Sequence, residues 1–262
     1  MESKKSVQAE KQTNLYITIC STCDGEGIDK NYKSCYSPIY GDMPNFCECL
    51  EGQKKRDAFK RENESLLSAY NSRIKNELFA KSGIPKRYTD ASIADLKDPM
   101  RKIVSEYCSN FSTISKNGWG FFIWGDVGVG KTHTASVIGN TLIETRLIPV
   151  LFTSIGDLSS RVRLGIQEKD SGERLWHKAQ TADFLILDDF GTERSTDWVK
   201  ENVYLTINAR YESKLPTVIT SNQSLEDISK TYSPQISSRI REANKILFFA
   251  GEDLRKSKKP HF

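Results

Sequence analysis

The sequence predicts an α/β fold in which helices cover both faces of a parallel β-sheet. From about Trp119 onward, short apolar runs alternate with helical stretches, which is the pattern of successive βαβ units. A glycine-rich segment follows the first apolar run, and Asp188 and Asp189 end a later one. Polar turns of this kind are typical of the edge at which open parallel sheets bind ligands.

The elements of this part follow one another in a regular order. The predicted strands are residues 120–124, 149–153, 184–187, 217–220 and 245–249. The predicted helical stretches are residues 131–146, 155–180, 196–213 and 234–241. Runs that are apolar throughout, and not only at alternate positions, indicate strands that are buried on both faces.

Length and composition exclude several classes of protein. A chain of 262 residues, 37% hydrophobic and 27% charged, fits one large globular domain or a medium domain with a small satellite. No apolar run reaches the roughly 18 to 20 residues needed to cross a bilayer. The N-terminus lacks the apolar stretch of a secretory signal, so we expect a cytoplasmic protein without a membrane partner. The formal net charge of +4 neither requires nor excludes nucleic acid.

Composition changes along the chain and divides it into four segments. We expect a disordered tail at residues 1–14, a cysteine-rich module at 15–53, a connector helix at 54–84 and the α/β domain at 85–262. The cysteine-rich module has few aliphatic residues, so we expect a metal ion to stabilise it. Apolar residues recur at steps of three and four from Leu66 to Leu78, until Gly83 and Pro85 end the predicted helix.

The cysteines indicate a metal site. Five of the six lie between residues 20 and 49, and in a reducing cytosol such crowding favours metal ligation over disulfides. Two close pairs on turns can supply four thiolates, and the predicted zinc ligands are Cys20, Cys23, Cys47 and Cys49. An iron–sulfur cluster or unligated reduced cysteines remain alternatives, and Cys35 could replace one of the four. Cys108 is most simply a small buried apolar residue.

The glycine-rich segment matches the phosphate-binding pattern G-x-x-x-x-G-K-[ST] between a predicted strand and a predicted helix. The glycines let successive backbone N–H groups point at a triphosphate, Lys131 bridges its β- and γ-phosphates, and the Thr132 hydroxyl ligates Mg²⁺. A glycine-rich turn without a ligand is the alternative. The predicted ATP-binding residues are Gly125, Asp126, Val127, Gly128, Val129, Gly130, Lys131, Thr132 and His133.

Polar residues after two other predicted strands complete this site. We expect Asp188 to hold Mg²⁺ through water and Asp189 to orient or deprotonate the attacking water. Asn222 follows the strand at 217–220 and can hold that water near the γ-phosphate. A solvated acidic turn and an ordinary Ser-Asn turn are the alternatives for these residues.

The ordered motifs of the chain resemble one family. They are Cys20-x-x-Cys23-Asp-x-Gly, Cys47-x-Cys49, Gly83-Ile-Pro85-x-Arg87-Tyr88, the phosphate loop, Leu185-Ile-Leu-Asp-Asp-Phe-Gly191-x-Glu193, Ile207-Asn-x-Arg210-Tyr211, Thr220-Ser-Asn222, Arg239-Ile-Arg241 and Gly251-x-Asp253-x-Arg255. This set resembles the bacterial and phage replicative helicase loaders of the DnaC/DnaI type, a branch of the AAA+ ATPases close to the IstB transposition helpers.

The resemblance implies an N-terminal module that grips a hexameric DnaB-type helicase and an ATPase domain that hydrolyses Mg-ATP, binds single-stranded DNA and self-associates. By position, Asp188 and Asp189 match the acidic pair and Asn222 matches the γ-phosphate sensor. Arg239 matches the arginine finger offered to a neighbouring subunit, and Arg255 matches the second sensor arginine. Residues 154–167, with Arg161 and Arg163, stand where family members carry a DNA-facing helix.

Two other functions remain open. An IstB-type transposition helper would coat duplex DNA, but proteins of that type generally lack the cysteine module, so the cysteines favour the loader. A nucleotide-gated adaptor would bind ATP with negligible hydrolysis. Steady-state ATPase activity with and without single-stranded DNA separates the adaptor from the other two.

Overall fold

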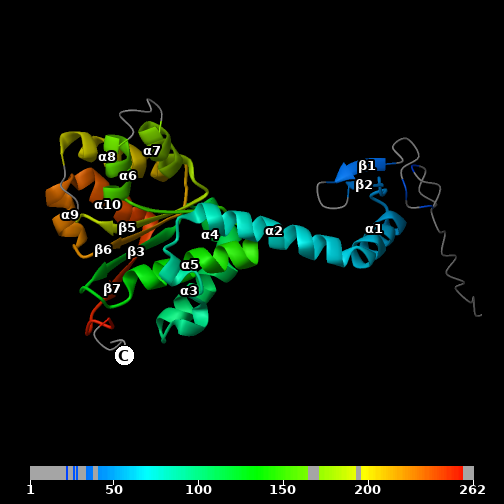
Figure 1. Cartoon of the computed structure of the whole chain (residues 1–262), viewed down its shortest axis with the longest axis horizontal. Coiled ribbons are helices and arrows are strands. Elements are labelled where there is room, and N and C mark those ends of the chain that lie inside the picture. Colours follow the sequence, from blue (N-terminus) through cyan, green and yellow to red (C-terminus); the bar gives the residue numbers. More distant parts are fainter. Residues whose placement is uncertain are drawn as a thin grey trace, which may run out of the picture. The chain divides into compact units, whose positions relative to one another are not determined.

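The computed structural model describes residues 22, 26, 28, 34–37, 41–164, 171–192 and 196–255 (Figure 1). The chain forms two compact units, residues 1–72 and 73–262, and the boundary falls within one helix. None of the helices in the described part of the chain is both long and apolar enough to span a bilayer.

The first unit contains a small antiparallel hairpin. Its strands β1 (Ser34–Ser37) and β2 (Gly41–Pro44) pair directly, and Ile28 forms an isolated bridge with Phe46. Phe46 also packs against Phe59 of the following helix, with ring centroids 5.6 Å apart. These contacts join the segment after the hairpin to the helix, and Phe46 and Cys47 are buried there.

The single helix predicted over residues 54–82 consists of two helices. Helix α1 (Leu50–Glu62) begins earlier than predicted, and α2 (Glu64–Ser82) follows after one residue. Asn63 separates them because its backbone, at φ −107° and ψ 22°, leaves the helical conformation, and its side-chain Nδ2 donates to the carbonyl of Phe59 at 2.8 Å. Gly83, at φ +75°, ends α2 where the sequence predicts.

The segment between α2 and the sheet contains short elements that the sequence did not reveal. They are the 3₁₀ turns η1 (Lys86–Tyr88) and η2 (Ile93–Asp95) and the helices α3 (Met100–Ser109) and α4 (Phe111–Lys116). Asn140 anchors this segment, since its Nδ2 donates to the carbonyls of Tyr88 (2.8 Å), Thr89 (3.1 Å) and Ala91 (2.8 Å). The segment therefore packs against the phosphate-loop helix by long-range contacts.

Five parallel strands form the central sheet of the second unit, and all five were predicted. They are β3 (Gly120–Gly125), β4 (Val150–Ser154), β5 (Phe184–Phe190), β6 (Thr217–Ser221) and β7 (Asn244–Phe249). Their order across the sheet is β4-β5-β6-β3-β7, with every neighbouring pair parallel. The predicted α/β class is confirmed.

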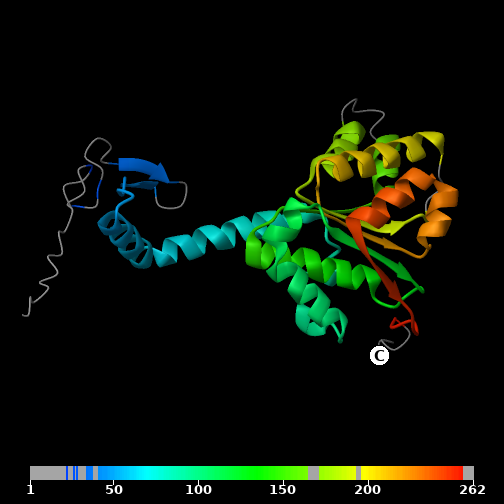
Figure 2. The same cartoon turned by 180° about the vertical axis from the view of Figure 1, so that it is seen from behind.

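Helices cover both faces of this sheet (Figure 2). One face packs against α3, α4 and α5 (Lys131–Arg146). The other face packs against α6 (Ile155–Leu164), α7 (Ser171–Thr181), α8 (Asp197–Glu212), α9 (Leu225–Thr231) and α10 (Pro234–Ala243). The helical stretch predicted over 155–180 corresponds to α6 and α7, and residues 165–170 lie outside the described part. The seven-residue helix α9 is too short to give a periodic signal.

Arg210, in α8, connects this helix by hydrogen bonds to the end of α7 and the start of β6. It is 2% exposed, and its guanidinium donates to the carbonyls of Ala179 (3.0 Å), Ala182 (2.8 Å) and Pro216 (2.8 Å) and to Thr217 Oγ1 (2.8 Å). Burial lowers the pKa of Arg210 to about 9. Since these partners lie in or after α7 and at the start of β6, Arg210 has a structural function in this motif.

Candidate nucleotide site

The carboxyl ends of β3, β5 and β6 meet at one edge of the sheet because β6 lies between the other two strands. Three polar segments follow these ends: the phosphate loop at 125–132, the acidic segment at 188–191 and the segment at 220–223. The structure thus brings together the residues that the sequence predicts for the nucleotide site, at the edge where open α/β sheets bind ligands.

The phosphate loop has the backbone that its glycines allow. Gly128 and Gly130 have φ of +83° and +96°, which side-chain-bearing residues rarely adopt, and α5 starts directly after them. Lys131 is 6% exposed, and its Nζ donates to the carbonyls of Gly125 (2.9 Å) and Asp126 (2.5 Å). Burial lowers the pKa of Lys131, which makes an anionic partner favourable for this ammonium group.

Two hydroxyl groups hold the carboxylate of Asp188. Its Oδ1 accepts hydrogen bonds from Thr132 Oγ1 at 2.9 Å and from Thr220 Oγ1 at 2.6 Å. Burial raises the pKa of Asp188, and these two hydrogen bonds oppose that shift. A hydroxyl and a carboxylate are hard oxygen donors, so the Thr132–Asp188 pair fits a Mg²⁺ ion.

Asp189 lies at an irregularity in the sheet. The β5–β6 register shifts between Leu187 and Phe190, and Asp189 has φ +53°, a left-handed conformation that aspartate tolerates better than most residues. Its backbone N–H donates to Thr220 Oγ1 at 3.0 Å, and the residue is exposed. The two neighbouring aspartates therefore differ, since Asp188 is half-buried and hydrogen-bonded whereas Asp189 faces solvent.

Side chains at the end of β6 fix the acidic segment by hydrogen bonds, and the sequence does not predict this function. Thr220 contacts both aspartates, Ser221 Oγ donates to the carbonyl of Phe190 at 2.6 Å, and Gln223 Nε2 donates to the carbonyl of Gly191 at 2.6 Å. Asn222, the predicted sensor, is exposed directly after the strand. The Thr220-Ser-Asn222 motif marks this strand end in the sequence, but the sequence predicts a function only for Asn222.

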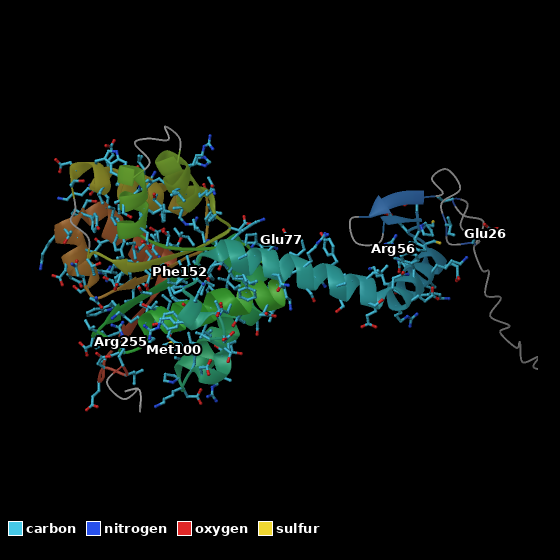
Figure 3. The ribbon with its side chains drawn as sticks, viewed as in Figure 1. Glu26, Arg56, Glu77, Met100, Phe152 and Arg255 are labelled. Atoms are coloured by element: carbon cyan, nitrogen blue, oxygen red, sulfur yellow. The ribbon has the colours of Figure 1, made fainter. Side chains whose placement is uncertain are left out.

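The segment after β7 contacts the phosphate loop, and the sequence predicts only Arg255 of this segment for the site. Leu254 N donates to the carbonyl of Gly128 at 3.1 Å, and Gly251 N donates to Asp126 Oδ2 at 3.4 Å. Asp253 Oδ1 fills the space that a Cβ at Gly128 would need, and the φ of +83° at Gly128 favours glycine at this position. The charge of Arg255 contributes to lowering the pKa of Lys131, and Figure 3 labels Arg255 at this end of the chain.

Arg239 lies at the other edge of the sheet. It lines a cavity of about 300 Å³ whose other walls include Gly118, Trp119, Thr217 and Asn244, at or before the amino ends of β3, β6 and β7. A six-residue strand is about 20 Å long, so this cavity is far from the phosphate loop of the same subunit. The position is compatible with an arginine that serves a neighbouring subunit.

The zinc prediction falls largely outside the described residues, because Cys20 and Cys23 do. Cys47 is buried, and Cys49 caps α1 through a hydrogen bond from Gly52 N to its Sγ at 3.4 Å. Among the described residues, no three His, Cys, Asp or Glu side chains gather as metal ligands. Cys108 is 4% exposed within α3, which confirms that it is a buried apolar residue, and burial raises its pKa to about 12.

Comparison with known proteins assigns the second unit to a family. The family model described as "IstB-like ATP binding protein" matches residues 90–259. The replicative helicase loader DnaI of Bacillus subtilis is 30% identical over 146 residues, which cover 53% of this chain and 46% of that protein. The replicative helicase loader DnaC of Buchnera aphidicola subsp. Baizongia pistaciae is 26% identical over 215 residues, which cover 79% of this chain and 83% of that protein.

Solved structures agree with these relatives. The crystal structure of the DnaC helicase loader has 27% sequence identity and a TM-score of 0.56, and the match covers 63% of this chain and 100% of that one. The likeness to loaders that the motifs predict is therefore confirmed.

Proposed function

Because this chain belongs to the family of IstB-like ATP-binding proteins, we propose that it binds and hydrolyses Mg-ATP to load a replicative DNA helicase onto single-stranded DNA. The observation that carries the proposal is the cluster of Thr132, Asp188 and Thr220 beside a phosphate loop. The relatives named helicase loaders support the loading function, since one of them matches over 79% of this chain.

The residues of the phosphate loop have distinct functions in nucleotide binding. Lys131 exchanges its two loop carbonyls for oxygens of the β- and γ-phosphates, which restores full charge pairing to a buried ammonium group. Thr132 and Asp188 hold Mg²⁺, Asp188 through water. When bound, Mg²⁺ would supply positive charge to the phosphates.

Hydrolysis requires a positioned water and stabilisation of negative charge. Asp189 orients and deprotonates the water, and Thr220 fixes the backbone of Asp189 through the hydrogen bond at 3.0 Å. Asn222 holds the same water from the neighbouring strand. Arg239 of a neighbouring subunit and Arg255 stabilise the charge of the transferred phosphoryl group.

Single-stranded DNA binding is assigned to the helical layer formed by α6, α7 and α8. Trp198 is 41% exposed, and its ring meets the buried ring of Trp176 edge-on, with centroids 6.0 Å apart. An exposed aromatic ring held by a buried one is a suitable platform for stacking a base. Arg161 and Arg163 are carried on α6 in the same layer and supply cationic groups for the DNA backbone.

Binding of the hexameric DnaB-type helicase and binding of zinc are assigned to the first unit. Cys20, Cys23, Cys47 and Cys49 would hold the zinc ion, which would supply folding free energy to a segment whose sequence has few aliphatic residues. About one equivalent of zinc in the purified reduced protein is the expected result of elemental analysis. Protein without metal contradicts this assignment, and visible absorption from a brown protein indicates an iron–sulfur cluster instead.

The Asp189→Asn variant tests the catalytic part of the proposal. It removes the charge that activates water but leaves the phosphate loop unchanged, so ATP affinity stays the same and hydrolysis falls by a factor of about 10² to 10⁴. Steady-state ATPase assays and calorimetry with ATP measure the two quantities. Normal hydrolysis by this variant moves the water-activating function to another residue.

Helicase pull-downs with the full chain test the biological part. Binding of a hexameric DnaB-type helicase, with ATP-dependent transfer of that helicase to single-stranded DNA, supports the loader. The second candidate is an IstB-type transposition helper, because the matching family model is described as IstB-like. ATP-dependent coating of duplex DNA without helicase binding supports that candidate.

A further inference from the structure

The guanidinium of Arg239 rests on two aromatic rings of the neighbouring helix. Its Cζ lies 5.1 Å from the ring centroid of Tyr204 and 6.0 Å from that of Tyr211. Both tyrosines belong to α8, seven residues apart and therefore on one side of the helix, and α8 packs against α10, which carries Arg239 (Figure 1). We call Tyr204 and Tyr211 the aromatic shelf.

The shelf holds a cation that has an unused hydrogen-bond donor. Arg239 Nη1 is buried and finds no acceptor among the residues that the structure describes. Arg241, two residues later on the same helix, instead forms an ion pair with Glu226 at 2.9 Å. Since a buried donor without an acceptor costs free energy, the arrangement at Arg239 favours binding of an acceptor from outside.

The shelf also contacts the helix that carries Arg239. Glu242, on α10, interacts with the hydroxyl of Tyr211 and raises the pKa of Tyr211. Glu242 lies three residues after Arg239, so the tyrosine that supports the guanidinium packs against the helix that carries it. A ring face attracts a cation without neutralising its charge, which leaves the guanidinium able to bind an anion.

We infer that Tyr204 and Tyr211 are positioning residues, which hold Arg239 ready for a phosphate group bound to a second copy of this chain. The inference rests on the proposed function, because it assumes that Arg239 acts on the nucleotide of a neighbour. The acceptor belongs to a second copy because the cavity beside Arg239 lies at the amino ends of the strands, whereas the phosphate loop of the same copy follows a carboxyl end. Each subunit thus provides a nucleotide site at one edge of its sheet and a held arginine at the other.

The first experiment compares three variants of α8 in the full chain. Tyr204→Leu removes the ring that lies nearest the guanidinium, Tyr204→Phe keeps the ring, and Leu205→Ala changes an exposed neighbour outside the shelf. We expect Tyr204→Leu to lower DNA-stimulated ATP turnover about tenfold or more, because small displacements of a catalytic group have large effects on rate. Tyr204→Phe restores the DNA-stimulated turnover that Tyr204→Leu loses. ATP affinity and melting temperature stay the same in all three variants.

A mixing experiment separates positioning from general damage to the subunit. Arg239→Ala keeps its nucleotide site and lacks the arginine, whereas Lys131→Ala lacks the site and keeps the arginine. Mixing the two restores turnover if the arginine acts on a neighbour. The double variant Lys131→Ala/Tyr204→Leu then fails to restore it, while Tyr204→Leu mixed with Lys131→Ala hydrolyses ATP, since the nucleotide site of Tyr204→Leu is intact.

The outcomes distinguish the inference from the proposed function. If Lys131→Ala does not rescue Arg239→Ala, the function of Arg239 between subunits is wrong. If rescue occurs and the double variant rescues equally well, only the positioning function of the shelf is overturned. Loss of turnover in Tyr204→Phe as large as that in Tyr204→Leu also overturns it, because the ring face is then not what matters.

Discussion

Charged side chains at the two edges of the central sheet differ in how completely they are hydrogen-bonded. At the carboxyl edge, Lys131 has two carbonyl partners and Asp188 has two hydroxyl donors, all from the same chain. At the amino edge, Arg210 donates to five acceptors, but Arg239, which lines the same cavity, keeps a buried Nη1 without an acceptor among the described residues. At the carboxyl edge, Lys131 and Asp188 thus find their partners within one subunit, and we infer that a second subunit supplies the acceptor for Arg239.

The largest expected effect is a difference in the free energy of unfolding between variants of the two arginines at the amino edge. Arg210→Ala leaves several buried carbonyls without donors, at about 1–3 kcal/mol each, so we expect a loss of roughly 3–5 kcal/mol in the free energy of unfolding. Within the described part of the chain, Arg239→Ala removes cation–π contacts but no side-chain hydrogen bond, so it should cost less than about 1 kcal/mol. Denaturant unfolding of both variants measures the difference, and equal losses would break the comparison.

At the carboxyl edge, Lys131→Ala tests whether the buried ammonium group is kept for phosphate. We expect ATP affinity to fall by more than tenfold, a loss of more than about 1.4 kcal/mol in binding free energy. Calorimetric titration with Mg-ATP measures it. Unchanged affinity in Lys131→Ala would remove the phosphate loop from nucleotide binding.

In the nucleotide-free protein, the ionised carboxylate of Asp188 should lower the free energy of unfolding. Its pKa is raised in the folded state, so the ionised form destabilises the fold, and this cost appears as pH rises through the unfolded and then the folded pKa. Asp188→Asn keeps an oxygen that can accept from Thr132 and Thr220 but removes the charge. We expect it to raise the free energy of unfolding by about 1 kcal/mol at neutral pH, with the gain shrinking in acid, and to lose Mg²⁺-dependent ATP binding. Lower stability of Asp188→Asn at neutral pH would contradict the prediction.

The smallest expected effect concerns the segment after β7. The carboxylate of Asp253 lies against Gly128, in a loop where phosphate is expected to bind, so its charge opposes the ligand. Asp253→Asn keeps an oxygen for the backbone N–H of Arg255 and should tighten ATP binding about two- to fivefold, or less than about 1 kcal/mol. Glu252→Gln serves as the control for a neighbouring exposed carboxylate, and a similar gain there would show a general charge effect.

Much of the fold and part of the site could be predicted because they depend on local patterns. All five strands and the helix that starts at Lys131 follow from apolar runs, periodicity and glycine positions within short windows. The structure also places Thr132, Asp188 and Asn222 at one edge, because the ends of parallel strands meet there. The segment at residues 86–116 was missed, since its short helices are held by distant contacts such as those from Asn140.

The sequence by itself determined the phosphate loop and the acidic pair, because each depends on residues that are consecutive in the chain. Only the tertiary structure decided which strands are neighbours, and the order β4-β5-β6-β3-β7 is what brings Thr220 to both aspartates. The same holds for Asp253 at the phosphate loop and for Arg239 on the aromatic shelf. These contacts join residues far apart in the chain, so their positions depend on the packing of the whole unit and leave no local pattern in the sequence.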